Sequence, residues 1–303
     1  MNYETLYNTV QAYTENTESL FLANIPVFVQ QAETRVYNAA ELPAIRRNVT
    51  GTVTTGNPYL TLPMDYLATY SIAAVDASGN YTYLLNKDTN FMREAYPQQS
   101  TSGLPRYYAL FGPESNNVRD LGFIMAPTPD QDYTVELHYF YYPPTIVKGQ
   151  ITGLNLTVAG NSYTTGVYQN VALTGGSGSA ATADIVVVGG VVTSCTLQFG
   201  GHFYVVGDVL SCSTPGTTGT AFTATVTSVS NSEGVSWLGD NYDPALLYGS
   251  MREAMLFMKQ EQDLVTYYET KFQEAIQQLV RLGDGLEGGD AYRDGMAKVK
   301  VSV

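Results

Sequence analysis

The sequence predicts an α+β protein in which a helical bundle, with two N-terminal and one or two C-terminal helices, carries an antiparallel β-unit and an inserted small all-β domain. Apolar residues recur with a helical period near both ends of the 303-residue chain, and short β-rich runs fill its middle. A third observation separates the insert from the rest. Between Lys148 and Arg252 there is no lysine or arginine, and residues 149–232 carry only two carboxylates, Asp184 and Asp208.

The first 42 residues predict two helices. Thr17 is the expected N-cap of the second helix. Pro26 falls inside that helix and is expected to kink or restart it, because proline removes a backbone donor. The first helix, residues 3–14, shows apolar and aromatic residues on one face: Tyr3, Leu6, Tyr7, Val10 and Tyr13.

The next segment predicts a β-unit built from short strands. In its last strand, alternation places Tyr133, Val135, Leu137 and Tyr139 on one face of a sheet. The β-rich runs are separated by glycine, proline and asparagine turns and cover residues 49–55, 59–62, 66–75, 81–85, 107–112, 121–125 and 133–141.

The weakly charged window predicts an inserted β-domain. Runs of β-branched residues at 185–188 and 191–193 flank Gly189-Gly190, a pair that suits a tight hairpin turn. A flexible Gly/Ser stalk is the alternative, but such a stalk would lack the valine and isoleucine runs. The expected division is residues 1–148 plus 234–282 as the core, 149–233 as the insert and 283–303 as an extended docking tail.

The C-terminal part predicts one or two helices followed by that tail. Asp243 is the expected N-cap, with Pro244 at the first helical position, and a bend is expected near Gln260. Glycines at 283, 285, 288 and 289 are expected to end the helical part. At the end of the tail, valines alternate with polar residues as in a half-buried strand, so a partner-binding strand is predicted at Lys298, Val299, Lys300, Val301 and Val303.

The composition of the chain limits the classes of function that it can have. Charged residues make up only 14% of the chain, tyrosine occurs 24 times, and the net charge is −13. Tyrosine-rich surfaces of low charge are typical of proteins buried in assemblies. The acidic charge argues against binding of a nucleic-acid backbone. Neither a signal-like N-terminus nor an apolar run of membrane-spanning length is present, so neither export nor membrane insertion is expected.

No catalytic, cofactor or metal site is expected. The cysteines, Cys195 and Cys212, are expected to be free rather than disulfide-bonded, and His138 and His202 have no second ligand at zinc-binding spacing. The scattered carboxylates Glu94, Glu114 and Asp120 are expected to be solvated. An enzyme is therefore the least favoured class.

Three motifs accompany the predicted order of elements: residues 59–66 (YLTLPMDY), 127–130 (PTPD) and 243–248 (DPALLY). Together they resemble the head-to-tail adaptor proteins of tailed bacteriophages, including the tubular adaptors of short-tailed phages. The resemblance covers residues 1–148 and 234–282. The insert, with residues 204–210 (YVVGDVL), is similar to a β-module that recurs in phage structural proteins.

This resemblance implies a structural virion protein without catalytic residues, made in the host cytoplasm and placed at the head-tail junction. It implies a homo-oligomeric, dodecameric ring beneath the portal protein that extends the DNA channel and docks a tail nozzle or tail tube protein. DNA would pass only as cargo. Tail fibres could attach through the insert, and the alternative function is a β-rich adhesin or fibre-anchoring module of a phage tail.

Overall fold

The structure is a computed structural model that describes the chain except for residues 41, 99, 113–120, 214–218 and 287–303 and the side chains of 284–286. The chain forms two compact units. Unit 1 consists of Met1–Ala40 and Pro144–Val303, and unit 2 is Glu41–Pro143. The mixed α+β class is confirmed. The predicted division into core, insert and tail stays a prediction, and we keep the name insert only as a label for residues 149–233.

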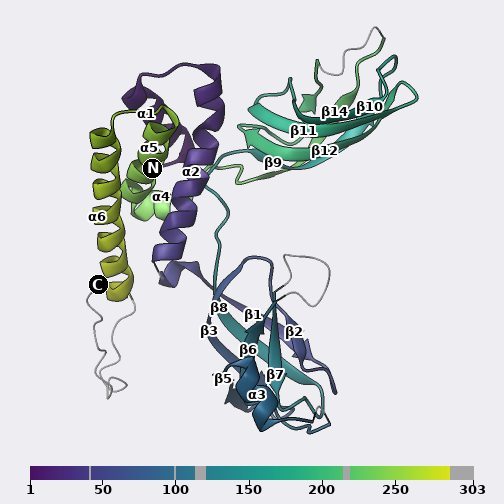
Figure 1. Ribbon diagram of the computed structural model, residues 1–303, viewed down its shortest axis with the longest axis vertical. Coiled ribbons are helices and arrows are strands. Elements are labelled where there is room, and N and C mark those ends of the chain that lie inside the picture. Colours follow the sequence, from purple (N-terminus) through teal and green to yellow (C-terminus); the bar gives the residue numbers. More distant parts are fainter. Residues whose placement is uncertain (41, 99, 113–120, 214–218, 287–303) are drawn as a thin grey trace. The chain divides into compact units, whose positions relative to one another are not determined.

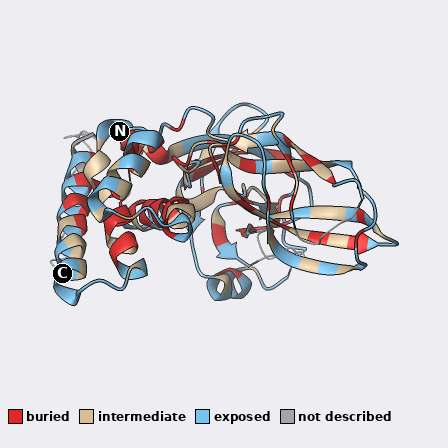
Figure 2. Ribbon diagram, turned by 90° about the horizontal axis from the view of Figure 1, so that it is seen from above, coloured by how far each residue is buried: buried red, intermediate tan, exposed pale blue. Residues whose placement is uncertain are grey.

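The helices of unit 1 pack around α5. In Figure 1, α5 lies between α2 and α6 and contacts both, and α1 also packs against it. Their buried residues face the neighbouring helices, while the opposite faces are exposed (Figure 2). Within the described residues, no helix is both long and apolar enough to span a membrane. The helices are α1 (Tyr3–Thr14), α2 (Ser19–Ala39), α4 (Trp237–Asn241), α5 (Asp243–Phe257) and α6 (Gln262–Leu286).

One prediction about α2, the cap at Thr17, is wrong, and of the two expectations for Pro26, a kink or a restart, the structure excludes the restart. Thr17 does not cap the helix: the N-cap is Glu18, and Asn16 accepts its N–H at 2.8 Å in a local turn. The helix does not restart at Pro26 but runs through it. Proline in a helix interior costs about 3 kcal/mol, because one backbone hydrogen bond is lost. Burial of the large apolar side chains of α2, which contributes roughly 1.5–3 kcal/mol each, outweighs that cost.

The C-terminal helices also differ in detail from the expectation. The N-cap of α5 is Tyr242, so Asp243 lies inside the first turn, where its charge still favours the helix dipole. A break near Gln260 is confirmed, because Lys259 adopts a φ of 53° between α5 and α6. Glycine at 283 does not end the last helix, which continues to Leu286. Glycine costs only about 1 kcal/mol in a helix interior.

The β part of unit 1 consists of two three-stranded antiparallel sheets around one core. The two sheets are joined along two edges. At one edge, Thr174 and Ser211 exchange backbone hydrogen bonds. At the other, backbone hydrogen bonds from β12 and from the residues just after it reach the chain just before and just after β9. Gly189 and Gly190 have φ values of 62° and 83° and form the predicted turn. The sheet orders are β10-β11-β12 and β13-β14-β9, from β9 (Gln150–Val158), β10 (Gly166–Ala172), β11 (Ser179–Val188), β12 (Val191–His202), β13 (Val209–Leu210) and β14 (Thr223–Ser230).

Unit 2 is a sandwich of two four-stranded sheets with a short helix on one outer face. The predicted face of β8 is confirmed: Tyr133, Val135, Leu137 and Tyr139 are all buried between the sheets. The helix α3 (Thr89–Ala95) covers the opposite side of β6 and β7 through Met92. The sheet orders are β1-β8-β3-β4 and β2-β7-β6-β5, from β1 (Arg46–Val53), β2 (Tyr59–Thr61), β3 (Tyr66–Val75), β4 (Tyr81–Tyr83), β5 (Leu85–Asn86), β6 (Tyr107–Phe111), β7 (Gly122–Ala126) and β8 (Tyr133–Tyr141).

The first strand of unit 2 begins earlier than the sequence predicts, at two arginines. Arg46 lies 4.1 Å from the ring centre of Tyr70, and Arg47 lies 3.8 Å from that of Tyr141. Arg47 also pairs with Asp65 at 2.8 Å. Aromatic rings and one carboxylate therefore hold both cations on an edge strand, where charged side chains are well tolerated.

Candidate interaction surfaces

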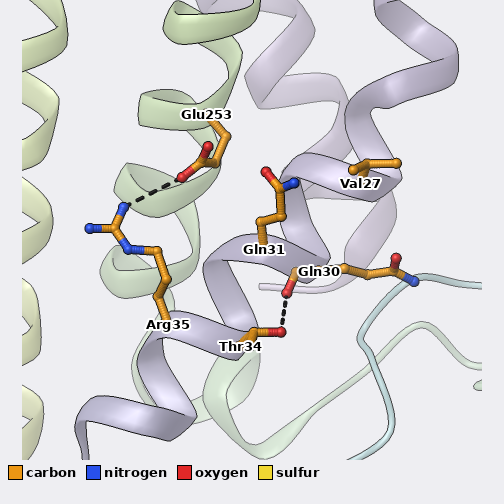
Figure 3. Close-up of a pocket in the computed structure, with 6 residues that line it drawn as sticks. All are labelled: Val27, Gln30, Gln31, Thr34, Arg35 and Glu253. Atoms are coloured by element: carbon orange, nitrogen blue, oxygen red, sulfur yellow. Dashed lines mark hydrogen bonds and ion pairs between the residues drawn. The ribbon is translucent and has the colours of Figure 1, made fainter.

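A groove of about 420 Å³ runs along α2 beside α5 in unit 1. Arg35 points across it toward Glu253, and Thr34 donates to the carbonyl of Gln30 at 2.9 Å (Figure 3). The Gln30 side chain reaches the insert, where its amide donates to Gln150 at 3.1 Å. Most of the exposed lining is carbon from side-chain stems, with amide, hydroxyl and charged groups at their ends. The lining consists of Val27, Gln30, Gln31, Thr34, Arg35 and Glu253.

The charges beside the groove neutralise one another. Arg35 of α2 contacts Glu253 at 3.4 Å and Glu269 of α6 at 3.0 Å. Arg252 of α5 contacts the same two carboxylates, at 2.5 and 2.9 Å. This network joins three helices, and because its charges are paired, the groove is suited to contacts with uncharged groups rather than to binding an ion.

Five tyrosines from α1, α5, α6 and the N-cap of α5 lie near one another. We call them the tyrosine face and define it as Tyr13, Tyr242, Tyr248, Tyr267 and Tyr268. The rings of Tyr267 and Tyr268 meet edge to face at 5.4 Å, and Tyr13 and Tyr267 are more than half exposed. Burial, together with the neighbouring phenols, raises the pKa of Tyr268. Such a face combines contact area with hydroxyl groups and is typical of protein interfaces.

The motif at residues 204–210 has a structural role. Asp208 accepts hydrogen bonds from the N–H of Val205 at 2.9 Å and from the N–H and hydroxyl of Ser177 at 3.1 and 2.7 Å. Burial opposes ionisation of Asp208, but these donors keep its pKa below the ordinary value. The carboxylate locks the turn before β13, and the ring of Tyr204 is buried in the insert core.

A chain of polar contacts joins α1 to the insert. The hydroxyl of Tyr3 lies 3.1 Å from Nδ1 of His202, and the hydroxyl of Ser179 lies 2.9 Å from Nε2. Burial lowers the pKa of His202 to about 4, so the ring is neutral at physiological pH. Phe203 stacks nearby against Tyr3 and Tyr7. The histidine therefore connects parts of unit 1 and stays uncharged.

The other residues singled out from the sequence do not converge. Cys195 and Cys212 do not form a disulfide, and burial raises the pKa of Cys195 to about 11. His138 lies in unit 2 beside Ser71 and Glu136. No cluster of three potential metal ligands occurs in the described part of the chain.

Several predicted residues lie outside the described residues. These are two of the scattered carboxylates, Glu114 and Asp120, and the whole predicted docking strand, Lys298, Val299, Lys300, Val301 and Val303. The third carboxylate, Glu94, is exposed on α3.

Sequence reasoning missed a buried carboxylate, Glu33, on the apolar face of α2. Glu33 is 3% exposed and accepts hydrogen bonds from Thr145 and Ile146. A signal was present, because Glu33 stands between Val29 and Val36 on the apolar stripe.

One comparison with known proteins identifies a relationship. A family model described as SU10 adaptor protein matches residues 1–184. The match includes α1, α2 and all of unit 2, and it extends into the insert as far as β11. A search of curated proteins finds no match.

Proposed function

The chain belongs to the SU10 adaptor protein family, and from this premise we propose that it forms a dodecameric ring beneath the portal protein, extends the DNA channel and docks the tail. The family is one of structural phage adaptors rather than of enzymes, and its members are virion components that contact other virion proteins. The single observation that carries the proposal is the family match over residues 1–184.

The surfaces of unit 1 support assembly between subunits. A ring needs two different faces on each subunit, because head-to-tail contacts close only when unlike faces meet. The tyrosine face is formed mainly by residues of α5 and α6, whereas the groove is lined mainly by residues of α2. Both faces avoid the repulsion that a net charge of −13 would cause between copies.

Particle composition tests the adaptor role. Purified particles should contain this chain in a fixed ratio to the portal protein, and a cryo-EM map should show it in a ring at the head-tail junction. The isolated chain should be a monomer or low oligomer in light scattering at micromolar concentration, because the entropy cost of the ring is more easily met on a portal template. A chain absent from the particles would overturn the proposal.

The C-terminal tail is predicted at residues 283–303, but α6 continues to Leu286, so the segment after Leu286 is proposed to dock on a neighbouring subunit or on the portal by strand addition. The alternation of Val299, Val301 and Val303 with Lys298 and Lys300 supports it, since main-chain bonds supply affinity and the valines supply register. Deletion of residues 296–303 should leave the melting temperature unchanged and abolish incorporation into particles. Normal incorporation of the truncated chain would contradict strand addition.

A second role, anchoring of tail fibres, is proposed for the insert. Its surface is almost free of charge, yet exposed valines such as Val167 and Val188 lie near the β11-β12 turn end, where the ladder pairs Val167 with Val186 and Val188 with Val191. Exposed apolar patches mark interaction sites. Particles that carry Val167→Ser and Val188→Ser should assemble normally but lose fibres, whereas retention of fibres would exclude this patch.

A further inference from the structure

A buried glutamate of α2 holds the chain where it enters the insert. The carboxylate of Glu33 accepts the hydroxyl of Thr145 at 2.6 Å and the N–H of Ile146 at 2.8 Å. Ile146 and Val147 are fully buried, whereas Glu33 is 3% exposed. A single side chain therefore binds residues 145–146 to the helix, away from water.

The chain segment that leaves the insert meets the same place. Asn231 donates from its side-chain amide to the carbonyl of Thr145 at 2.9 Å, and its backbone carbonyl accepts the N–H of Gly149 at 3.3 Å. The N–H of Tyr3 in turn donates to the carbonyl of Gly234 at 2.8 Å. Both connections of the insert are thus tied to each other beside Glu33, so loosening of residues 145–147 affects the entry and the exit together.

The titratable groups around Glu33 do not neutralise its charge. From α1, Tyr3 lies near enough to interact with Glu33, and a charge on Glu33 helps to raise the pKa of the Tyr3 phenol, which burial raises most, so Tyr3 stays neutral. From β12, His202 contacts the hydroxyl of Tyr3 and is neutral. The segment itself carries Lys148, which is partly exposed.

The charged groups of the neighbouring helices form ion pairs with groups other than Glu33. Arg35, two residues after Glu33 on α2, contacts Glu253 of α5 and Glu269 of α6. Arg252 contacts the same two carboxylates. At the start of the chain, the N-terminal ammonium donates to the carbonyl of Gly239 and lies 3.8 Å from Asp243. None of these contacts places a cation on Glu33.

Burial is the dominant influence on Glu33. It raises the pKa of Glu33 to about 7, although the hydrogen bonds from Thr145 and Ile146 act in the opposite direction. The folded chain therefore prefers the neutral carboxyl, while the unfolded chain ionises near 4.5. Because the pKa is raised on folding, the stabilising effect is complete below pH 4.5 and is lost as the pH rises through 7.

We propose that Glu33 is a proton-sensitive latch: its neutral form holds residues 145–147 against α2, and its ionisation loosens this segment and with it both connections of the insert. Exposure of the carboxylate to water becomes favourable once the group is charged. The latch is formed by residues of unit 1, and it does not depend on the proposed role in the virion.

Amide exchange at Ile146 tests the latch. After correction for the intrinsic pH dependence of exchange, opening at this amide should increase on the order of a hundred-fold between pH 5 and pH 8, since one pKa unit corresponds to a factor of ten. The neutral variant Glu33→Gln should show opening that does not change with pH. The control Glu261→Gln, at an exposed position between α5 and α6, should behave like the wild type. Opening that does not change with pH in the wild type, or opening in Glu33→Gln with the same pH dependence as the wild type, would overturn the proposal.

A measurement on the unmodified chain covers the case in which Glu33→Gln does not fold. Carbon-detected NMR of the Glu33 carboxyl should give a titration midpoint near 7. The Ile146 amide resonance, which reports its hydrogen bond to this carboxyl, should shift with the same midpoint. A midpoint near 4.5 would show that the carboxylate reaches water in the folded chain, and the latch would be rejected.

Discussion

His202 shows how one buried side chain makes stability depend on pH. The ring is 1% exposed and lies between the hydroxyls of Tyr3 and Ser179. These contacts join α1 to β11. They depend on a neutral ring, since the pKa of His202 is lowered to about 4 by burial.

Acidification should therefore destabilise the wild type through this residue. The folded pKa lies below the unfolded value of 6.5, so the stabilising effect is present above 6.5 and is lost as the pH falls toward 4. The loss amounts to at most about 3 kcal/mol of unfolding free energy. Denaturant unfolding of His202→Gln should lack this pH-dependent part, whereas His138→Gln, at a partly exposed site in unit 2, should retain it.

Glu33 and His202 change the unfolding free energy with pH in opposite directions. The difference between the wild type and a variant is therefore the quantity to measure. Over the range from pH 4.5 to 6.5, acidification strengthens the site of Glu33 while it weakens that of His202. The wild-type curve alone can therefore look flat. An unchanged pH slope in His202→Gln relative to the wild type would contradict the assignment.

At the scale of elements, α5 depends on close approach to two other helices. A Cβ atom at Gly249 would lie 2.7 Å from Cβ of Ala32 in α2 and 2.9 Å from the ring of Phe272 in α6. Both neighbours are fully buried. The absence of a side chain at Gly249 is therefore what permits the spacing of α2, α5 and α6.

Gly249→Ala should destabilise the chain by about 1–3 kcal/mol through overpacking. This result would be contrary to intrinsic propensity, because alanine favours an exposed helix by about 1 kcal/mol over glycine. Chemical denaturation measures the effect. The control Thr270→Ala, at an exposed position of α6, should stay within about 0.5 kcal/mol of the wild type. A stabilised Gly249→Ala would mean that the helices can separate without cost.

At the scale of the whole molecule, the insert leaves and re-enters the helical part at neighbouring points. The hydrogen bond from Gly149 to Asn231 and that from Asn231 to Thr145 bring its ends together. The insert also contacts the helices, through His202 and Phe203 against α1 and through Gln150 against α2. Deletion is therefore geometrically simple but removes stabilising contacts.

Replacement of residues 149–233 by a short Gly-Ser turn should leave a helical protein that melts cooperatively at a lower temperature than the full chain. Circular dichroism at 222 nm during heating measures both properties. A matched control lengthens the turn at Gly189-Gly190 by the same linker and should keep the full-length melting temperature. A molten or insoluble deletion variant would show that the remaining core does not fold without residues 149–233, and the predicted domain division would be wrong.

Local patterns were sufficient for the α+β class, the face of β8, the turn at Gly189-Gly190 and the break near Gln260, because alternation, helical period and turn chemistry act over a few residues. The candidate surfaces were not predictable in this way. The ion network of Arg35, Arg252, Glu253 and Glu269 joins three helices, and neither the groove nor the tyrosine face exists until α2, α5 and α6 pack.

The sequence by itself determined where the chain changes character: helical ends, a β-rich middle and a window from 149 to 232 with two carboxylates. Only the tertiary structure decided that Pro26 stays inside a helix and that Glu33 meets Thr145 and Ile146 away from water. The physical reason is the separation along the chain of the residues that determine each property. Periodicity follows from neighbours along the chain, whereas burial and the pKa of a side chain depend on segments that become neighbours only in the folded state.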